Sequence, residues 1–261
     1  MPYRPNIYWA EKGAPVGVGA SANYHAILRG RIKLNSAGAP HCVANEYVAA
    51  HLGRIVGLPI PPGGVVQTDD GDIGWASLTF APRGEALPDI VPTEVIAQMP
   101  EVASMVLVFD LLTANVDRHA GNLAHIPPRR LEVYDHSHAL FHLAPDSCDY
   151  LRRIRERFLL DGAFSTLGRT GRHCFLDHVT QPELLDGAIE HIRRVLTDET
   201  LKQVTEEVAA LDLVTKDAAT CLYICLRFRR DNLAKMVYNH RAEFRAIPED
   251  GWGLLWESKS L

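Results

Sequence analysis

The spacing of hydrophobic residues changes about a third of the way along this 261-residue chain. Residues 24–28 (YHAIL) follow a glycine-rich stretch and are typical of a strand, and residues 65–67 and 75–80 are typical of strands flanking an Asp-Asp-Gly-Asp turn. Residues 43–56 instead place apolar side chains at helical spacing and stop at Gly-Leu-Pro. Residues 1–80 are therefore predicted to form a small lobe of strands that carries one helix.

Helical spacing dominates from about residue 93 onward. Four segments share it: 93–115, 182–196, 198–211 and 216–245. Residues 81–92 contain three prolines and little periodicity, which indicates a linker. The predicted fold is therefore α+β, with a small strand-rich lobe (1–80), a larger helical lobe (81–261) and a cleft between them.

Composition and charge narrow the classes of function. The chain has 27 Lys and Arg against 32 Asp and Glu, a net charge of -5, which argues against nucleic acid as the main partner. The apolar runs are too short to span a membrane, so no membrane anchor is expected. The five cysteines are odd in number and irregularly spaced, which does not suggest a disulfide framework and fits a cytoplasmic location. Cys221 and Cys225 are expected to be buried apolar residues on one helix face.

The most informative segment follows the first long apolar helix. It reads NVDRHAGN over residues 115–122, and a predicted strand ending in Asp135 comes soon after. Asp117 and Asn122 are five residues apart with a glycine between them, so the loop can turn both side chains toward one point. Carboxylate and amide oxygens are hard ligands that suit Mg²⁺. The segment therefore predicts a magnesium site that leaves room for phosphate and water.

This segment resembles the catalytic loop of the HipA-like kinases and, more distantly, that of phosphatidylinositol kinases. The resemblance implies a two-lobed protein-kinase-like fold with Mg²⁺ and ATP as cofactors in the cleft. It also implies that Asp117 accepts the proton of a substrate hydroxyl and that Asn122 and Asp135 hold the metal ion. Phosphoryl transfer mainly needs positioning and neutralised charge, which such groups supply.

Other candidate site residues surround this loop. Arg118 and His119, next to Asp117, are expected to brace the loop by pairing with Asp110 or with backbone carbonyls. Glu46, on the helix of the strand-rich lobe, corresponds to the residue that orients a phosphate-binding lysine in the family. Gly17 and Gly19 are candidates for a loop whose backbone N–H groups face the phosphates.

The sequence departs from the family pattern at that lysine. The strand after the glycine-rich stretch places Ile27 where the lysine is expected. Arg29, on the same strand face, and Lys33, further on, are the candidate replacements. The departure is compatible with an active kinase that uses a relocated cation, with a weakened enzyme, or with a nucleotide-binding pseudokinase.

The sequence is compatible with three functions. The first is an ATP-dependent phosphotransferase that acts on a hydroxyl, expected to be a Ser or Thr of a protein substrate, with a small-molecule hydroxyl as the other option. The second is a pseudokinase that serves as a regulator or interaction module. The resemblance also allows for a regulatory partner protein such as an antitoxin. The third is a zinc hydrolase built from the clustered histidines and two aspartates, namely His119, His125, His136, His138, His142, Asp117 and Asp135.

Overall fold

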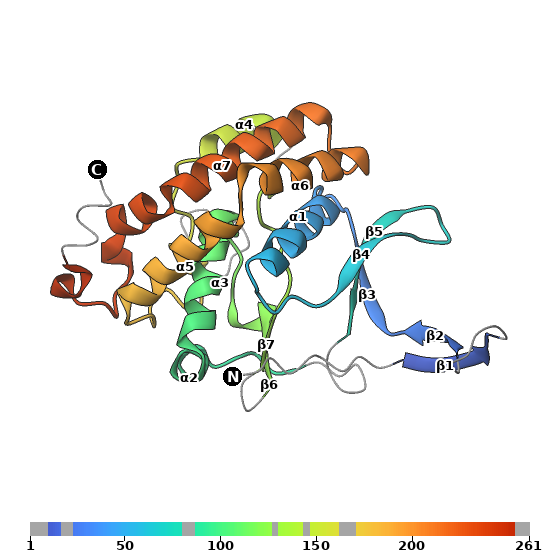
Figure 1. The fold of residues 1–261 in the computed structure, drawn as a ribbon, viewed down its shortest axis with the longest axis horizontal. Helices are drawn as coiled ribbons and strands as arrows, with labels where there is room; N and C mark the ends of the chain where they lie inside the picture. The colour runs from blue at the N-terminus through green and yellow to red at the C-terminus, as the bar shows by residue number, and fades with distance from the viewer. Residues whose placement is uncertain are drawn as a thin grey trace.

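The computed structural model describes residues 10–16, 23–79, 87–126, 130–142, 147–161 and 171–253. Strands occupy most of the first third and helices most of the remainder, so the predicted α+β class is confirmed (Figure 1). The elements of the first part are β1 (Ala10–Pro15), β2 (Tyr24–Leu28), β3 (Gly30–Leu34), α1 (Cys42–Ile55), β4 (Gly63–Gln67) and β5 (Ile73–Leu78).

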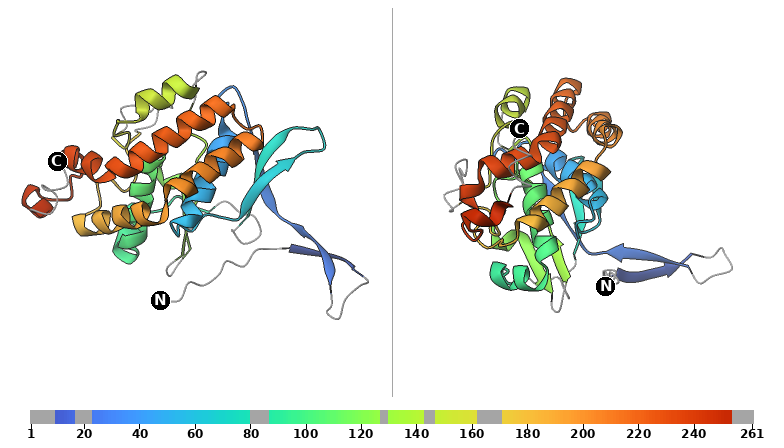
Figure 2. Two further views of the ribbon diagram at one scale, coloured as in Figure 1. Left: turned by 45° about the horizontal axis from the view of Figure 1, so that its top comes forward. Right: turned by 60° about the vertical axis from the view of Figure 1, so that its left-hand side comes forward.

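Two separate antiparallel sheets make up the strand-rich part. β3, β5 and β4 form a three-stranded sheet in that order, and the predicted turn between β4 and β5 is present with Gly71 at a φ of 87°. β1 and β2 form a two-stranded ribbon that projects away from the rest of the molecule (Figure 2). The chain from residue 24 to residue 34 therefore contributes to both sheets, with Arg29 between its two halves.

The second part is built mainly from helices around a short hairpin. Its elements are α2 (Pro92–Gln98), α3 (Pro100–Leu112), β6 (Leu123–Ile126), β7 (Arg130–Val133), α4 (Ser147–Ile154), α5 (Pro182–Val195), α6 (Asp198–Ala210), α7 (Lys216–Asn239) and the 3₁₀ turns Ala120–Asn122, Arg241–Glu243 and Glu249–Trp252. The single helix predicted over 93–115 is in fact two, because Pro100 has no N–H to continue the first helix and instead begins the second.

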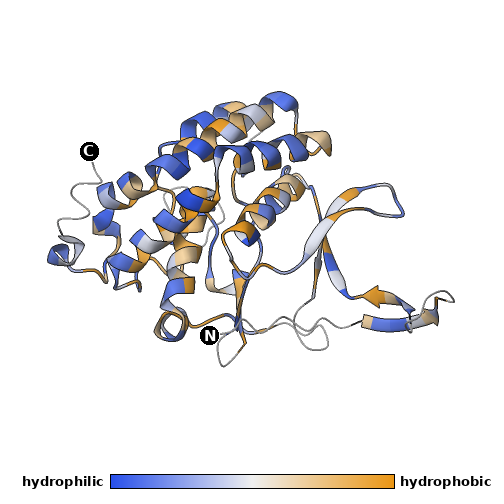
Figure 3. Ribbon diagram, in the orientation of Figure 1, coloured by the Kyte–Doolittle hydropathy of each residue, from blue (hydrophilic) through white to orange (hydrophobic). Residues whose placement is uncertain are grey.

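α1 connects the two parts of the molecule. It packs on the β3-β5-β4 sheet and on α6, and most of its residues are buried. The outer helices are amphipathic: α5 buries Leu185, Ala188, Ile189 and Ile192, and hydrophilic and hydrophobic residues alternate along α5 and α7 in Figure 3. No single helix in the described ranges is long and apolar enough to cross a membrane; α2 and α3 pass such a test only as a pair bent by 119°.

Arg229 of α7 fastens the ends of two other helices. Its side chain is fully buried and donates hydrogen bonds to the carbonyls of Leu111 and Leu112 at the end of α3 and of Ile154 at the end of α4. A cation at helix C-termini is favoured by the helix dipoles. Burial lowers the pKa of Arg229 to about 10. The end of α3, where the NVDRHAGN loop begins, is thus attached to α7.

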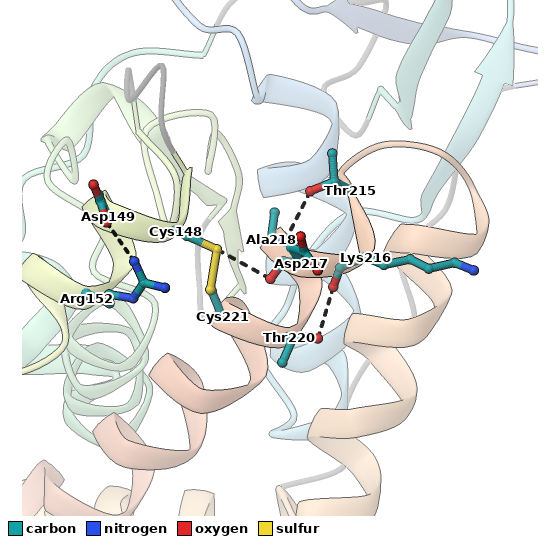
Figure 4. The surroundings of a disulfide bond; sticks show 9 residues. All are labelled: Cys148, Asp149, Arg152, Thr215, Lys216, Asp217, Ala218, Thr220 and Cys221. Atoms are coloured by element: carbon teal, nitrogen blue, oxygen red, sulfur yellow. Dashed lines mark hydrogen bonds and ion pairs between the residues drawn. A yellow bond between two sulfur atoms is a disulfide. The ribbon is translucent and has the colours of Figure 1, made fainter.

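A disulfide bond corrects the prediction made from the cysteines. Cys148 of α4 is bonded to Cys221 of α7, with their Cα atoms 5.5 Å apart (Figure 4). Cys225 is buried, as predicted, but Cys221 is not simply an apolar residue beside it. The two bonded residues are 73 positions apart in the sequence, and only the packing of α4 on α7 brings them together. Because disulfide bonds are rare in a reducing cytoplasm, this bond removes the support that the cysteine pattern gave to a cytoplasmic location.

Candidate active site

A buried ion pair holds the NVDRHAGN loop. Arg118 Nε lies 2.7 Å from Asp110 Oδ2, and both side chains are fully buried. Arg118 Nη1 also donates to the carbonyl oxygens of Asn122, at 2.9 Å, and Tyr134, at 2.6 Å. The predicted pairing of Arg118 with Asp110 and with backbone carbonyls is confirmed. Arg118 therefore braces the loop and joins it to the residue that precedes Asp135.

Asp110 has a second partner on a distant part of the chain. His173 Nε2 lies 3.1 Å from Asp110 Oδ2, and His173 Nδ1 accepts a hydrogen bond from the N–H of Phe175. Burial alone would raise the pKa of Asp110, but the charge of Arg118 and the hydrogen bond from His173 outweigh burial and lower it. Asp110 therefore remains an anion inside the core, and the segment after residue 171 is tied to the loop.

Local hydrogen bonds shape the loop itself. Asn122 Nδ2 donates to the carbonyl oxygen of Asp117 at 2.8 Å, and His119 Nδ1 accepts from the N–H of Gly121 at 3.1 Å. A Cβ atom at Gly121 would lie 2.9 Å from Asp89 Oδ1 and 3.0 Å from the His119 ring, so a larger residue there would have to displace these side chains. His119 Nε2 lies 4.0 Å from Asp117 Oδ2, and the Asp117 side chain is 18% exposed. His119 thus braces the loop as predicted, and the Asp117 carboxylate beside it is partly exposed.

Asp135 follows β7 in an unusual backbone conformation. Its φ is 62°, a left-handed value that non-glycine residues rarely adopt and that often marks functional positions. Its Oδ1 atom accepts from Ser137 Oγ at 2.6 Å and lies 2.8 Å from Lys33 Nζ. Burial alone would raise the pKa of Asp135, but Lys33 and Ser137 lower it well below the usual range of a carboxyl group. The side chain is therefore held as an anion.

Lys33 on β3, one of the two candidate replacements for the missing lysine, is the one that contacts Glu46. Its Nζ atom lies 2.5 Å from Glu46 Oε1 as well as 2.8 Å from Asp135 Oδ1. The predicted pairing of Glu46 with a lysine is thus present. Arg29, the other candidate, instead lies 3.3 Å from Glu11 on the exposed β1-β2 ribbon, where Ile27 is 67% exposed. The cation beside Glu46 thus stands on β3 and not on the strand of Ile27, because β2 and β3 are separate strands of different sheets.

Charges reinforce one another around Lys33. Burial alone would lower the pKa of Lys33, but the two carboxylates raise it. Burial alone would raise the pKa of Glu46, but contact with His136 and the charge of Lys33 lower it. Glu46 Oε1 also accepts the backbone N–H of His136 at 3.0 Å. Glu46 therefore positions Lys33 and, at the same time, the chain immediately after Asp135.

These groups meet in a cleft of about 310 Å³ between the sheet and the helical part. Its polar lining includes Lys33, Glu46, Asn122 and Asp135. The apolar lining comes from both parts of the chain: Ile60, Pro61, Trp75, Leu78 and Leu87. Asp117 and His119 stand on the same loop as Asn122 but do not line the cavity. A ligand with an apolar, flat portion and an anionic portion matches this lining.

The donor atoms fit a magnesium ion. Both contacts of Asp135 use Oδ1, which leaves Oδ2 for a metal, and Asn122 uses its Nδ2 atom for Asp117, which leaves Oδ1. Mg²⁺ is commonly held by one or two protein oxygens together with phosphates and water. Within the described ranges, no three His, Cys, Asp or Glu side chains could hold a metal ion, so the cluster expected for a zinc hydrolase is not formed. His136 is instead fully buried, and His138 and His142 contact each other.

Gly17 and Gly19 lie outside the described residues. Asn45, which the sequence did not single out, is fully buried; it donates to the carbonyl of Ser137 at 2.8 Å and accepts from the N–H of Phe141 at 3.2 Å. Its only signal in the sequence is its position next to Glu46. A polar residue on a predicted helix is ordinarily assigned to the solvated face, and α1 is buried on nearly every side.

Comparisons with known proteins add the fold relationship. No family model matches the sequence, and no curated protein matches it. The structure is similar to a Helicobacter pylori proinflammatory kinase, CtkA, with a TM-score of 0.57 and 14% identity over 92% of this chain and 99% of that chain. It also matches HipA of Shewanella oneidensis MR-1, in a complex with HipB and operator DNA, with a TM-score of 0.43 and 12% identity over 95% of this chain and 69% of that one.

The first match carries the conclusion about the fold. It covers nearly all of both chains, so the likeness to a kinase extends over both the strand-rich and the helical parts. The second match is too distant to add an argument. The kinase-like fold implied by the sequence resemblance is therefore confirmed, and at this level of identity the match speaks to the fold alone.

Proposed function

We propose that this protein is an ATP- and Mg²⁺-dependent phosphotransferase that transfers the γ-phosphoryl group to a Ser or Thr hydroxyl of a protein. One observation carries the proposal: Lys33 of β3 contacts both Glu46 of α1 and Asp135, which follows β7, in a cleft that Asn122 also lines. Phosphoryl transfer needs a cation that binds phosphate, carboxylates that hold it and the metal ion, and a base. Lys33 with its two carboxylates, next to the loop that carries Asp117, offers these groups.

Each residue has a role that its surroundings support. Asp117 has a partly exposed carboxylate and would accept the proton of the attacking hydroxyl. Lys33 would bind phosphate oxygens, with Glu46 orienting it. Asn122 and Asp135 would hold Mg²⁺, which when bound neutralises charge on the phosphates. Arg118 supports the loop from the core. Its buried pair with Asp110 holds its side chain in place, and its hydrogen bonds fix the backbone at Asn122 and Tyr134.

The position of Lys33 favours an enzyme over a pseudokinase. The pseudokinase alternative depended on the loss of the phosphate-binding lysine, and a lysine in contact with Glu46 and Asp135 removes that reason. The kinase-like fold supports the class of reaction. A protein as the acceptor, a regulatory partner protein and a cytoplasmic setting follow from the resemblance to HipA-like kinases and are part of the proposal.

The proposal is tested by separating ATP binding from transfer. We expect calorimetric titration to show ATP binding that requires Mg²⁺ and that Asp135→Asn abolishes, because that substitution removes the metal-binding carboxylate. Asp117→Asn should bind Mg²⁺ and ATP with unchanged affinity. Its rate of phosphoryl transfer, followed as autophosphorylation or as release of phosphate from ATP, should fall about 10²- to 10⁴-fold, the usual contribution of a general base.

Either of two results would contradict the proposal. A folded wild-type protein that does not bind ATP in the presence of Mg²⁺ would exclude the reaction. Full transfer activity in Asp117→Asn would exclude the assigned base. Circular dichroism melting of each variant is the control, and Asp117→Asn should melt as the wild type does because its carboxylate lies outside the buried network.

A further inference from the structure

Arg31 is a second cation on the wall of the cleft formed by β3. Side chains alternate along a strand, so Arg31 and Lys33 lie on the same face. Their partners on β5 are Ser77 and Trp75, and all four residues line the cleft. Two positions along a strand span about 6.5 Å. The side chains of Arg31 and Lys33 can therefore reach different parts of one extended anion.

The two cations differ in their partners. Lys33 contacts two carboxylates, whereas Arg31 forms no ion pair with any carboxylate in the described part of the chain. The lining holds Lys33 and Arg31 as cations and Glu46 and Asp135 as anions. Without Arg31 this set would carry one net negative charge, which opposes the entry of a polyphosphate. Arg31 is the cation of the described lining whose charge is not already matched.

Arg31 also faces the helical wall. Burial raises the pKa of Tyr134, and the charge of Arg31 acts on the same hydroxyl in the opposite direction. Tyr134 Oη donates to the carbonyl oxygen of Gly121, which adjoins Asn122, at 3.0 Å. Arg31 therefore lines the same cleft as Tyr134, Gly121 and Asn122, and its charge is close enough to act on the Tyr134 hydroxyl.

We infer that Arg31 binds the phosphate chain of the nucleotide, at a phosphate different from the one that Lys33 contacts. The inference rests on the proposed function and assigns it a binding residue. A guanidinium group suits this task because its planar set of N–H donors can form two hydrogen bonds with one phosphate. Its exposed position in the free protein leaves it available for an incoming ligand.

The test compares three ligands in the presence of Mg²⁺: ATP, inorganic tripolyphosphate and adenosine. In Arg31→Gln, calorimetric affinity for ATP and tripolyphosphate should fall about 10- to 100-fold, the usual effect of losing a charge-assisted hydrogen bond. Affinity for adenosine should be unchanged. Arg31→Lys keeps the charge but not the fork of donors, and its losses should lie between those of the wild type and Arg31→Gln.

Arg29→Gln is the matched control. Arg29 has the same charge, lies two residues away and pairs with Glu11 outside the cleft, so its removal should change the affinity for ATP less than twofold. Equal losses in both glutamine variants would overturn the inference, since they would show a general effect of net charge. A loss of adenosine affinity in Arg31→Gln would also overturn it and would indicate stacking on the base.

The outcomes also separate this inference from the proposed function. ATP binding that Arg31→Gln leaves unchanged would reject this inference and retain the proposed function. A wild-type protein that binds tripolyphosphate through Arg31 but does not bind ATP would reject the nucleotide as ligand, and with it both the proposed function and this inference. A folded wild-type protein that binds neither would reject both. Melting curves check folding, and Arg31→Gln should match the wild type because Arg31 is exposed.

Discussion

The two walls of the cleft are supported in different ways. On the helical wall, Asp110 and Arg118 are fully buried and bond to each other and to the backbone on either side of the loop. On the strand wall, Lys33 is 31% exposed, Arg31 is exposed, and Ile32, on the opposite face of β3, is 55% exposed. The helical wall is held by the protein alone, whereas the strand wall leaves its charges accessible to a ligand.

This difference suits the proposed chemistry. Catalytic groups must be held in position before the substrate arrives, because correct geometry lowers the barrier to reaction. Groups that bind a polyphosphate must exchange water for ligand, so partial exposure is an advantage. Removing one member of a charged pair on the helical wall should therefore lower the free energy of unfolding more than removing one on the strand wall.

The largest expected effect follows from Asp110→Asn. This change leaves the buried Arg118 guanidinium without a counter-charge, and breaking such a pair costs about 3–5 kcal/mol. Urea denaturation of the variant and the wild type measures the loss. Asp149→Asn is the matched control, since Asp149 pairs with Arg152 at 2.7 Å but both side chains are more than 60% exposed. It should cost less than about 1 kcal/mol, and equal losses in the two variants would contradict the comparison.

A smaller effect is expected from the disulfide between α4 and α7. Cys148→Ser removes a bond that closes a loop of 73 residues, and such bonds typically contribute about 2–4 kcal/mol to the free energy of unfolding. Urea denaturation under oxidising conditions measures the change. A dithiol reductant should lower the stability of the wild type to that of Cys148→Ser and leave the variant unchanged. Identical wild-type curves with and without the reductant would show that this bond does not stabilise the protein.

The smallest loss is expected on the strand wall, in Lys33→Met. Lys33 is partly exposed, so its removal should cost about 1–3 kcal/mol at pH 7, between the values for surface and buried pairs. Lys202→Met, in an exposed pair with Glu206, is the matched control and should cost less than about 1 kcal/mol.

The cost of Lys33→Met should depend on pH in a defined direction. Glu46 and Asp135 have lowered pKa values in the folded protein, so the stability they gain from Lys33 is present above their unfolded pKa values and is lost as the pH falls. Lys33 has a raised pKa, so its share is lost only as the pH rises beyond about 10. The difference from the wild type should thus be largest between about pH 5 and pH 10, and a constant difference from pH 3 to pH 7 would contradict this account.

Much of the helical wall could be predicted from sequence because its information is local. The eight residues from Asn115 to Asn122 contain the proposed base, a metal ligand and the brace, and their spacing within one loop limits how far apart they can lie. The pairing of Arg118 with Asp110 could be predicted because the two residues are only eight positions apart, across the end of one helix. Asn45 and His173 could not be found in this way, because their partners are 63 to 96 residues distant.

By itself the sequence determined the α+β class, the approximate bounds of β2, α1, α5 and α6, and the composition of the loop, since these depend on residue periodicity and short-range spacing. The tertiary structure decided which cations face the cleft, because the register of β3 on β5, and not the spacing from a glycine-rich stretch, places Lys33 and Arg31 on the inner face. It also decided that Cys148 meets Cys221. Contacts between distant segments depend on how whole elements pack, and no local pattern in the chain encodes that packing.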